Sequence, residues 1–192
     1  EPVASAVIAE DMTFAAELAL VGDQYVVISV DGQDMLIIAV EDKDITLTYD
    51  AEAEDVIVEG SVAQTAIDEA SNELVALFGD ENATEEDVIA VLERVIKDNG
   101  DNLASLYFLR YLPMFGADEA LYEELFNGIS KEYANLSVYK DAETRIANAK
   151  NTVIGADLQD IVLPDAEGNM ISVAELCKSG KWVLVDFWAP WC

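Results

Sequence analysis

Val56-Ile57-Val58-Glu59-Gly60-Ser61 is the stretch in which the hydrophobic period of the sequence changes, and it decides the fold class. Before Gly60, apolar and polar side chains alternate at the period of a half-buried strand, most clearly over residues 45–49. After Gly60, apolar residues recur three and four positions apart, as in residues 88–96, which is the spacing of one helix face. The sequence therefore predicts an α+β protein in which strands precede helices.

The strand-forming region is expected to be an antiparallel β domain over residues 1–61. Residues 25–30 and 35–40 are apolar runs separated by Asp31-Gly32, which is a hairpin turn signal. Residues 45–49 and 56–58 add two short strands. Together these four runs predict antiparallel pairing through residues 23–60.

Residues 62–150 are predicted to be a helical segment. The pattern Thr84 to Asp87 caps the helix predicted around residues 88–96, and Asn99-Gly100 ends it. Residues 103–112 are apolar nearly all round, which predicts a buried helix. Five aromatic residues at helical spacing are expected to be core rather than a ligand pocket: Tyr107, Tyr111, Phe115, Tyr122 and Phe126.

The last part of the chain, residues 151–192, is predicted to be the incomplete start of an α/β domain. Residues 158–163 predict a strand, residues 164–169 a turn, and residues 172–178 a helical turn that follows a short return strand. Residues 182–188 form a nearly continuous apolar run, typical of a central strand covered on both faces.

Composition excludes several classes of function. The 192 residues include 39 acidic and 10 basic ones, a net charge of −29 that disfavours nucleic acid and anionic membrane surfaces. Histidine is absent, which excludes Ser-His-Asp catalysis and His-ligated zinc, and the two cysteines cannot form a four-thiolate site. No apolar run reaches the ~20 residues of a membrane span. We expect no metal and no cofactor, and chemistry from carboxylates, hydroxyls or a thiol.

The thiol of Cys192 is the first candidate catalytic group. A strand that runs into Trp191-Cys192 would present the thiol at the start of a helix, where unpaired N–H groups stabilise a thiolate. Asp186 stands alone in the apolar run, where burial would favour its neutral form and let it accept and return a proton. The alternative for Asp186 is a chance residue at a strand end that faces water.

Cys177 is expected to be a small buried or half-buried thiol. A strand over residues 182–188 would separate Cys177 from Cys192 by ~20 Å, whereas a disulfide requires Cα atoms within ~7 Å. The acidic residues at 80–87 are expected to form a solvated loop and helix start, since they lack the spacing of a calcium loop.

The segment Asp186-Phe187-Trp188-Ala189, followed by Trp191-Cys192, resembles the active site of thioredoxins. The layout from Ile154-Gly155 through Gly180-Lys181 resembles the TlpA/ResA branch of envelope thiol-disulfide oxidoreductases, and residues before 153 resemble the β-rich domain of unknown function that precedes thioredoxin domains. The resemblance implies that Cys192 is the attacking cysteine, Asp186 the proton-relay acid, and Trp188 and Trp191 the substrate-binding surface. Peroxiredoxins place Thr or Ser where Ala189 stands, which favours disulfide exchange over peroxide reduction.

The resemblance further implies disulfide exchange on proteins of the periplasm or cell envelope of a Gram-negative bacterium, with protein disulfides and a thiol electron donor as partners. The second cysteine, the helix after it and the first strands of the β-rich domain are absent, so both ends are expected to be truncated and the fragment itself inactive. Trp182, Phe187, Trp188 and Trp191 should then expose apolar area that favours a homo-oligomer. The alternative is a non-enzymatic binding or dimerisation module in residues 1–150.

Overall fold

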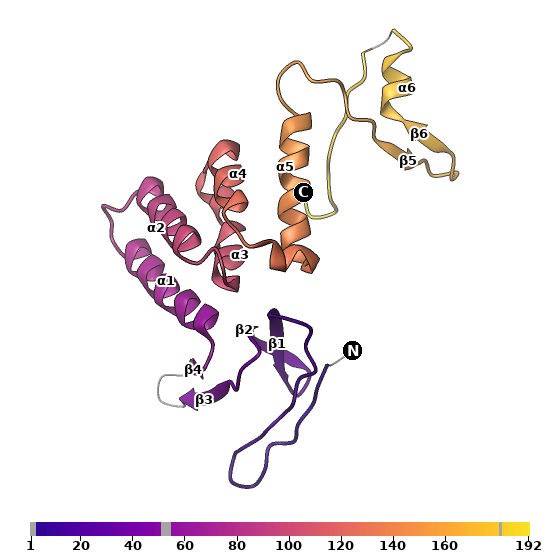
Figure 1. The fold of residues 1–192 in the computed structure, drawn as a ribbon. Coiled ribbons are helices and arrows are strands. Elements are labelled where there is room, and N and C mark those ends of the chain that lie inside the picture. Colours follow the sequence, from indigo (N-terminus) through magenta and orange to yellow (C-terminus); the bar gives the residue numbers. More distant parts are fainter. Residues whose placement is uncertain (1–2, 51–54, 181) are drawn as a thin grey trace. The chain divides into compact units, whose positions relative to one another are not determined.

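The computed structural model describes residues 3–50, 55–180 and 182–192, and it confirms the mixed α+β fold (Figure 1). Two compact units divide the chain, Glu1–Thr144 and Arg145–Cys192. The first unit holds the strands β1–β4 and most of the helices, and the second holds a short hairpin and one helix.

The first hairpin pairs β1 (Gln24–Val30) with β2 (Gln33–Val40) in antiparallel register, as predicted. Its turn is Asp31-Gly32, with φ angles of 50° and 79°. Both residues lie in the left-handed region that a two-residue hairpin turn requires, which explains why Asp-Gly marks the turn so clearly.

The second hairpin pairs β3 (Thr46–Asp50) with β4 (Asp55–Glu59), also antiparallel. Side chains of both hairpins share one apolar cluster, centred on the buried residues Ile38, Val40 and Val58. Apolar residues from the chain before β1, from all four strands and from the position just before β3 pack around this centre: Leu18, Leu20, Val26, Ile28, Leu36, Ile45, Leu47 and Val56. The antiparallel strands predicted over residues 23–60 are thus confirmed for the described residues.

The junction between β4 and helix α1 (Val62–Phe78) is a tightly built turn. Gly60 has φ 99°, and a Cβ atom there would lie 2.3 Å from the carbonyl oxygen of Asp44. The Ser61 hydroxyl caps the helix by accepting from the Gln64 backbone N–H at 2.9 Å. Only glycine fits before this cap, because any side chain would be both strained and in collision with backbone.

Polar side chains link the end of β2 to the first turn of α1. The Glu41 carboxylate accepts hydrogen bonds from the backbone N–H groups of Val62 at 3.0 Å and Ala63 at 3.1 Å. The Gln64 side-chain oxygen accepts from the Ala39 N–H at 2.9 Å. Glu41 is 9% exposed, so its negative charge is held among N–H donors that would otherwise be unpaired at a helix start.

The helical segment follows the predicted pattern. Helix α2 (Glu85–Asp98) begins with the expected capping box of Thr84 and Asp87, and α3 (Leu103–Leu109) is buried along most of its length. A short 3₁₀ turn over Leu112–Phe115, helix α4 (Glu119–Asn127), a second 3₁₀ turn over Lys131–Asn135 and helix α5 (Ser137–Asn151) complete it.

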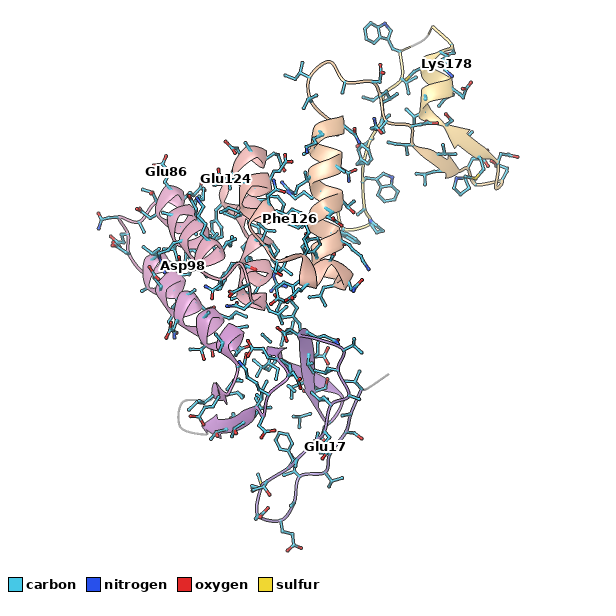
Figure 2. All side chains as sticks on the ribbon, viewed as in Figure 1. Glu17, Glu86, Asp98, Glu124, Phe126 and Lys178 are labelled. Carbon is cyan, nitrogen blue, oxygen red and sulfur yellow. The ribbon has the colours of Figure 1, made fainter. Side chains whose placement is uncertain are left out.

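The aromatic residues divide into two groups. Tyr122 and Phe126 are buried as predicted, and Phe126, labelled in Figure 2, packs against Tyr139 of α5 with ring centroids 4.7 Å apart. Tyr107, Tyr111 and Phe115 are only half-buried. The exposed Arg110 guanidinium lies over the Tyr107 and Tyr111 rings, 4.5 and 4.7 Å from their centroids. The three half-buried rings therefore lie at the edge of the core, and Tyr107 and Tyr111 also contact the Arg110 cation.

The second unit contains β5 (Val162–Pro164), β6 (Met170–Ser172) and α6 (Val173–Cys177). The two strands pair in antiparallel register around the expected turn, where Asp165 accepts from the Asn169 backbone N–H at 2.8 Å. The strand predicted for residues 158–163 is shorter than expected and begins only at Val162. In the described residues, no helix is long and apolar enough to cross a membrane.

The central strand predicted for residues 182–188 is wrong for this structure. These residues form neither strand nor helix, and most of them are exposed. A central strand needs hydrogen-bonding neighbours on both sides, and no described strand pairs with this segment. The apolar side chains of this segment therefore have no neighbouring strands to pack among.

Replacing Glu41 by glutamine should make the stability of the first unit less dependent on pH. Burial raises the pKa of Glu41, but the hydrogen bonds from Val62 and Ala63 and from the Lys43 ammonium lower it by more, so the net pKa lies below 4.5. The carboxylate therefore stabilises the fold above the unfolded pKa, and this contribution is lost as pH falls through the folded pKa. We expect Glu41→Gln to lower the free energy of unfolding by about 1 kcal/mol near neutral pH, with no difference at low pH.

Urea unfolding of both proteins across the acid range measures this difference. The exposed Glu59→Gln on β4 is the matched control and should change little at any pH. An equal loss from Glu41→Gln at neutral and acid pH would show that the carboxylate charge is not responsible.

Gly60→Ala should destabilise the first unit more than Gly32→Ala. Both glycines have positive φ, so both substitutions add backbone strain of about 1–2 kcal/mol. Only at Gly60 does the added Cβ meet backbone, at 2.3 Å from the Asp44 oxygen, whereas Gly32 has nothing within 4 Å. Thermal unfolding of the two variants measures the difference, and equal destabilisation would contradict the close approach.

Candidate functional site

The candidate site is the turn formed by residues 189–192. The Cys192 backbone N–H donates to the Ala189 carbonyl at 2.8 Å, which closes a four-residue turn. Pro190 occupies the second position of this turn, where its fixed φ is already suited to the bend and its missing N–H is not needed. The Pro190-Trp191 sequence thus folds the chain back so that Cys192 faces Ala189.

The Cys192 sulfur takes part in this turn. The Ala189 backbone N–H donates to Cys192 Sγ at 3.3 Å, within hydrogen-bond distance for sulfur. Cys192 is exposed and unpaired with any other cysteine. This contact holds the sulfur on the turn, where it is open to an approaching disulfide. The turn therefore supplies locally the N–H donor that sequence analysis expected from a helix start.

Exposed aromatic side chains precede and flank the thiol in the chain. Trp188 and Trp191 are 72% and 86% exposed, and Trp182 and Phe187 are 103% and 80% exposed. The prediction that these four residues would expose apolar area is confirmed. These four large apolar side chains lie within residues 182–191 and are open to contact with another molecule.

Asp186 does not lie where the sequence predicted. It is exposed and outside any strand, so its predicted burial on a central strand is wrong. The cause is the missing sheet around residues 182–188: without neighbouring strands, Phe187 and Val185 cannot enclose the carboxylate. The structure therefore gives no physical reason for a proton relay through Asp186.

Cys177 is a second free thiol at the last residue of α6. Its predicted burial is wrong, because the short helix lies on the surface of the second unit and none of its residues is buried. Cys177 and Cys192 are both free thiols in this structure. Among the described residues, no three His, Cys, Asp or Glu side chains are grouped as metal ligands would be.

Sequence reasoning missed one contributor to the site, the Ala189 backbone N–H. Its signal is the spacing of Pro190 and Cys192, which together form positions two and four of a turn. The contact between the nitrogen and the sulfur requires a side-chain rotamer that the sequence does not specify.

Comparison of the chain with protein-family models, curated proteins and solved structures finds no match in any of the three.

Proposed function

We propose that Cys192 is the attacking thiol of a thioredoxin-like thiol-disulfide oxidoreductase. The observation that carries the proposal is the exposed Cys192 sulfur in a closed turn, with the Ala189 N–H at 3.3 Å. The resemblance of residues 185–192 to the thioredoxin active site supports the same chemistry. It also supports a place in the cell envelope, where protein disulfides are the substrates and a thiol donor supplies electrons.

In the proposed reaction, the Cys192 thiolate attacks one sulfur of a substrate disulfide. A bond forms between that sulfur and Cys192 Sγ, the substrate S–S bond breaks, and the other substrate sulfur leaves as a thiolate that takes a proton from water. A second thiol must then attack Cys192 Sγ, which releases the substrate fully reduced and leaves a new disulfide. The thiol electron donor reduces that disulfide and completes the cycle.

Trp188 and Trp191 are proposed to contact the substrate chain beside the disulfide. Their rings are large, rigid and mostly exposed, and tryptophan is enriched in protein interfaces because burial of such a ring gains much at little entropic cost. Asp186 has no relay role in this proposal, because its carboxylate is exposed.

A non-enzymatic binding or dimerisation module in residues 1–150 is the second candidate, and residues 1–144 of it form the first unit. This unit has its own core and contains neither of the two cysteines, so its role need not involve thiol chemistry. Binding by the first unit and disulfide exchange by Cys192 are compatible in one chain.

Cys192 should react with a disulfide faster than Cys177, although both thiols are exposed. The Cys192 sulfur accepts a hydrogen bond from the Ala189 N–H, whereas no hydrogen bond to the Cys177 sulfur is found among the described residues. We expect a rate about two- to tenfold higher for Cys192, the size of one net hydrogen bond. Mass spectrometry of the Cys177→Ser and Cys192→Ser variants with hydroxyethyl disulfide, an uncharged probe, measures both rates. A faster reaction at Cys177 would refute the assignment.

The 192-residue chain should not catalyse insulin reduction by dithiothreitol above background. Its motif holds a single thiol, Cys192, so the reaction is expected to stop at the mixed disulfide. The comparison is a longer version in which Cys192 is followed by the second cysteine of a Cys-x-x-Cys motif and by a thioredoxin-like sequence. Equal turnover by both chains would contradict this prediction, and inactivity of both would favour the binding module.

A further inference from the structure

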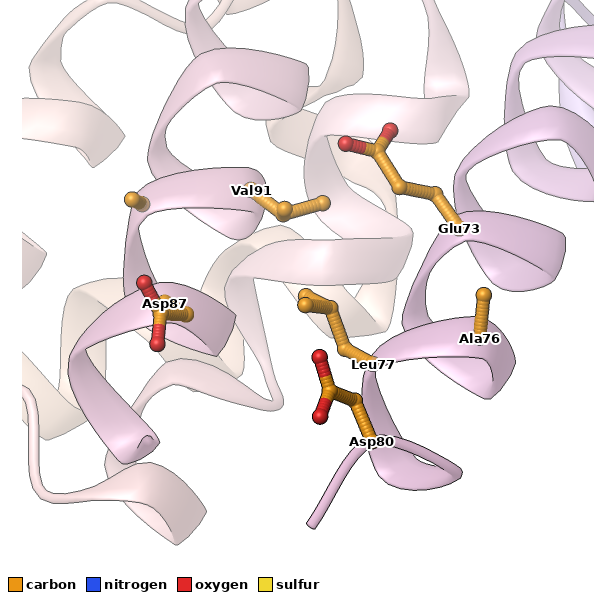
Figure 3. A pocket seen from close by; sticks show the side chains of 7 residues that line it. Glu73, Ala76, Leu77, Asp80, Asp87 and Val91 are labelled. Atoms are coloured by element: carbon orange, nitrogen blue, oxygen red, sulfur yellow. The ribbon is translucent and has the colours of Figure 1, made fainter. Parts of the chain in front are cut away.

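A groove lies between the C-terminal half of α1 and the N-terminal half of α2, with a cavity volume of about 510 Å³. Figure 3 shows Leu77 of α1 and Val91 of α2 extending toward each other across it. Ala76 and Ala90 also line the groove, and their small side chains leave space between the helices. The apolar surface is thus recessed, and a long, narrow side chain fits it better than a flat surface does.

Three carboxylates surround this apolar surface: Glu73, Asp80 and Asp87 (Figure 3). Glu73 forms an ion pair with Arg94 of α2, which neutralises that part of the groove. In the described part of the chain, no lysine or arginine pairs with Asp80 or Asp87. The groove therefore has one neutralised end and one end with two negative charges.

Asp80 and Asp87 both line the groove. Hydrogen bonds from the Asn82 backbone and side chain, at 2.9 and 3.0 Å, lower the pKa of Asp80, while desolvation and, to a smaller extent, the negative charge of Asp87 raise it. Both carboxylates are exposed and charged near neutral pH. A cation placed between them would relieve this repulsion.

We propose that this groove binds a basic, apolar-containing segment of a partner protein. The methylene chain of a lysine lies along Leu77 and Val91, its ammonium reaches Asp80 and Asp87, and a neighbouring apolar side chain fills the space beside Ala76 and Ala90. The proposal does not depend on the chemistry of Cys192.

Charge also argues against a second copy of this chain as the occupant. The chain has 39 acidic and 10 basic residues, so two copies repel each other, whereas a basic segment is attracted to the whole surface and then to the groove. Charge complementarity therefore selects a cationic protein segment.

Titration of the nitrogen-15-labelled full chain with a blocked peptide of alternating leucine and lysine tests the proposal by NMR. We expect amide shifts concentrated at Leu77, Asp80, Asp87 and Val91. Asp80→Asn should weaken binding about two- to fivefold, the effect of an exposed ion pair, while an amide oxygen at this position can still accept from Asn82. Ala90→Trp should fill the groove and remove the shifts.

Two controls separate the groove from general attraction to an acidic protein. Asp141→Asn on α5 removes the same charge from an exposed site outside the groove and should leave the affinity unchanged. A glycine–lysine peptide of equal charge should bind more weakly, because it cannot use the apolar surface. Shifts spread over the acidic surface, equal effects of Asp80→Asn and Asp141→Asn, or equal binding of the two peptides would each overturn the proposal.

Discussion

The arrangement of hairpins and helices in the first unit depends on the hydrogen bonds that join the end of β2 to the start of α1. The Glu41 carboxylate, just past β2, accepts from the Val62 and Ala63 amides, while the Gln64 side chain returns to the Ala39 amide on the strand itself. These bonds run between the same two elements, so they fix where the helix begins and in which direction it leaves the hairpins. Because α1 forms one wall of the groove between α1 and α2, these bonds also help to fix the position of that wall.

Local chemistry explains why much of this unit could be predicted from sequence. Asp31-Gly32 specifies its own turn, and Thr84 with Asp87 caps a helix using neighbours three residues apart. Glu41 is different, because the amide of Val62 that it binds lies 21 residues further along the chain. Nothing beside Glu41 in the sequence marks it as a helix cap, since that role arises only when the hairpins and the helix have packed.

Residues 182–188 show where a sequence pattern alone is insufficient to predict structure. Their apolar run satisfies the sequence pattern of a central strand, but a strand is stable only as part of a ladder, and no described strand of this chain pairs with it. The predicted burial of Asp186 depends on that strand, and Asp186 is exposed because the strand does not form. The turn at residues 189–192 formed nevertheless, because Pro190 and a single backbone hydrogen bond determine it locally.

Because Asp186 is exposed, its charge can act on an approaching partner. It is the only charged residue in residues 182–192, so the charge nearest to Cys192 in the motif is negative. That charge and the net charge of −29 repel anionic disulfides and attract cationic ones before any contact is made. The acid-lined groove between α1 and α2 selects for the same sign of charge by direct contact. Two surfaces in separate units, one proposed to react and one proposed to bind, therefore favour the same class of partner, a protein with basic residues near the segment it presents.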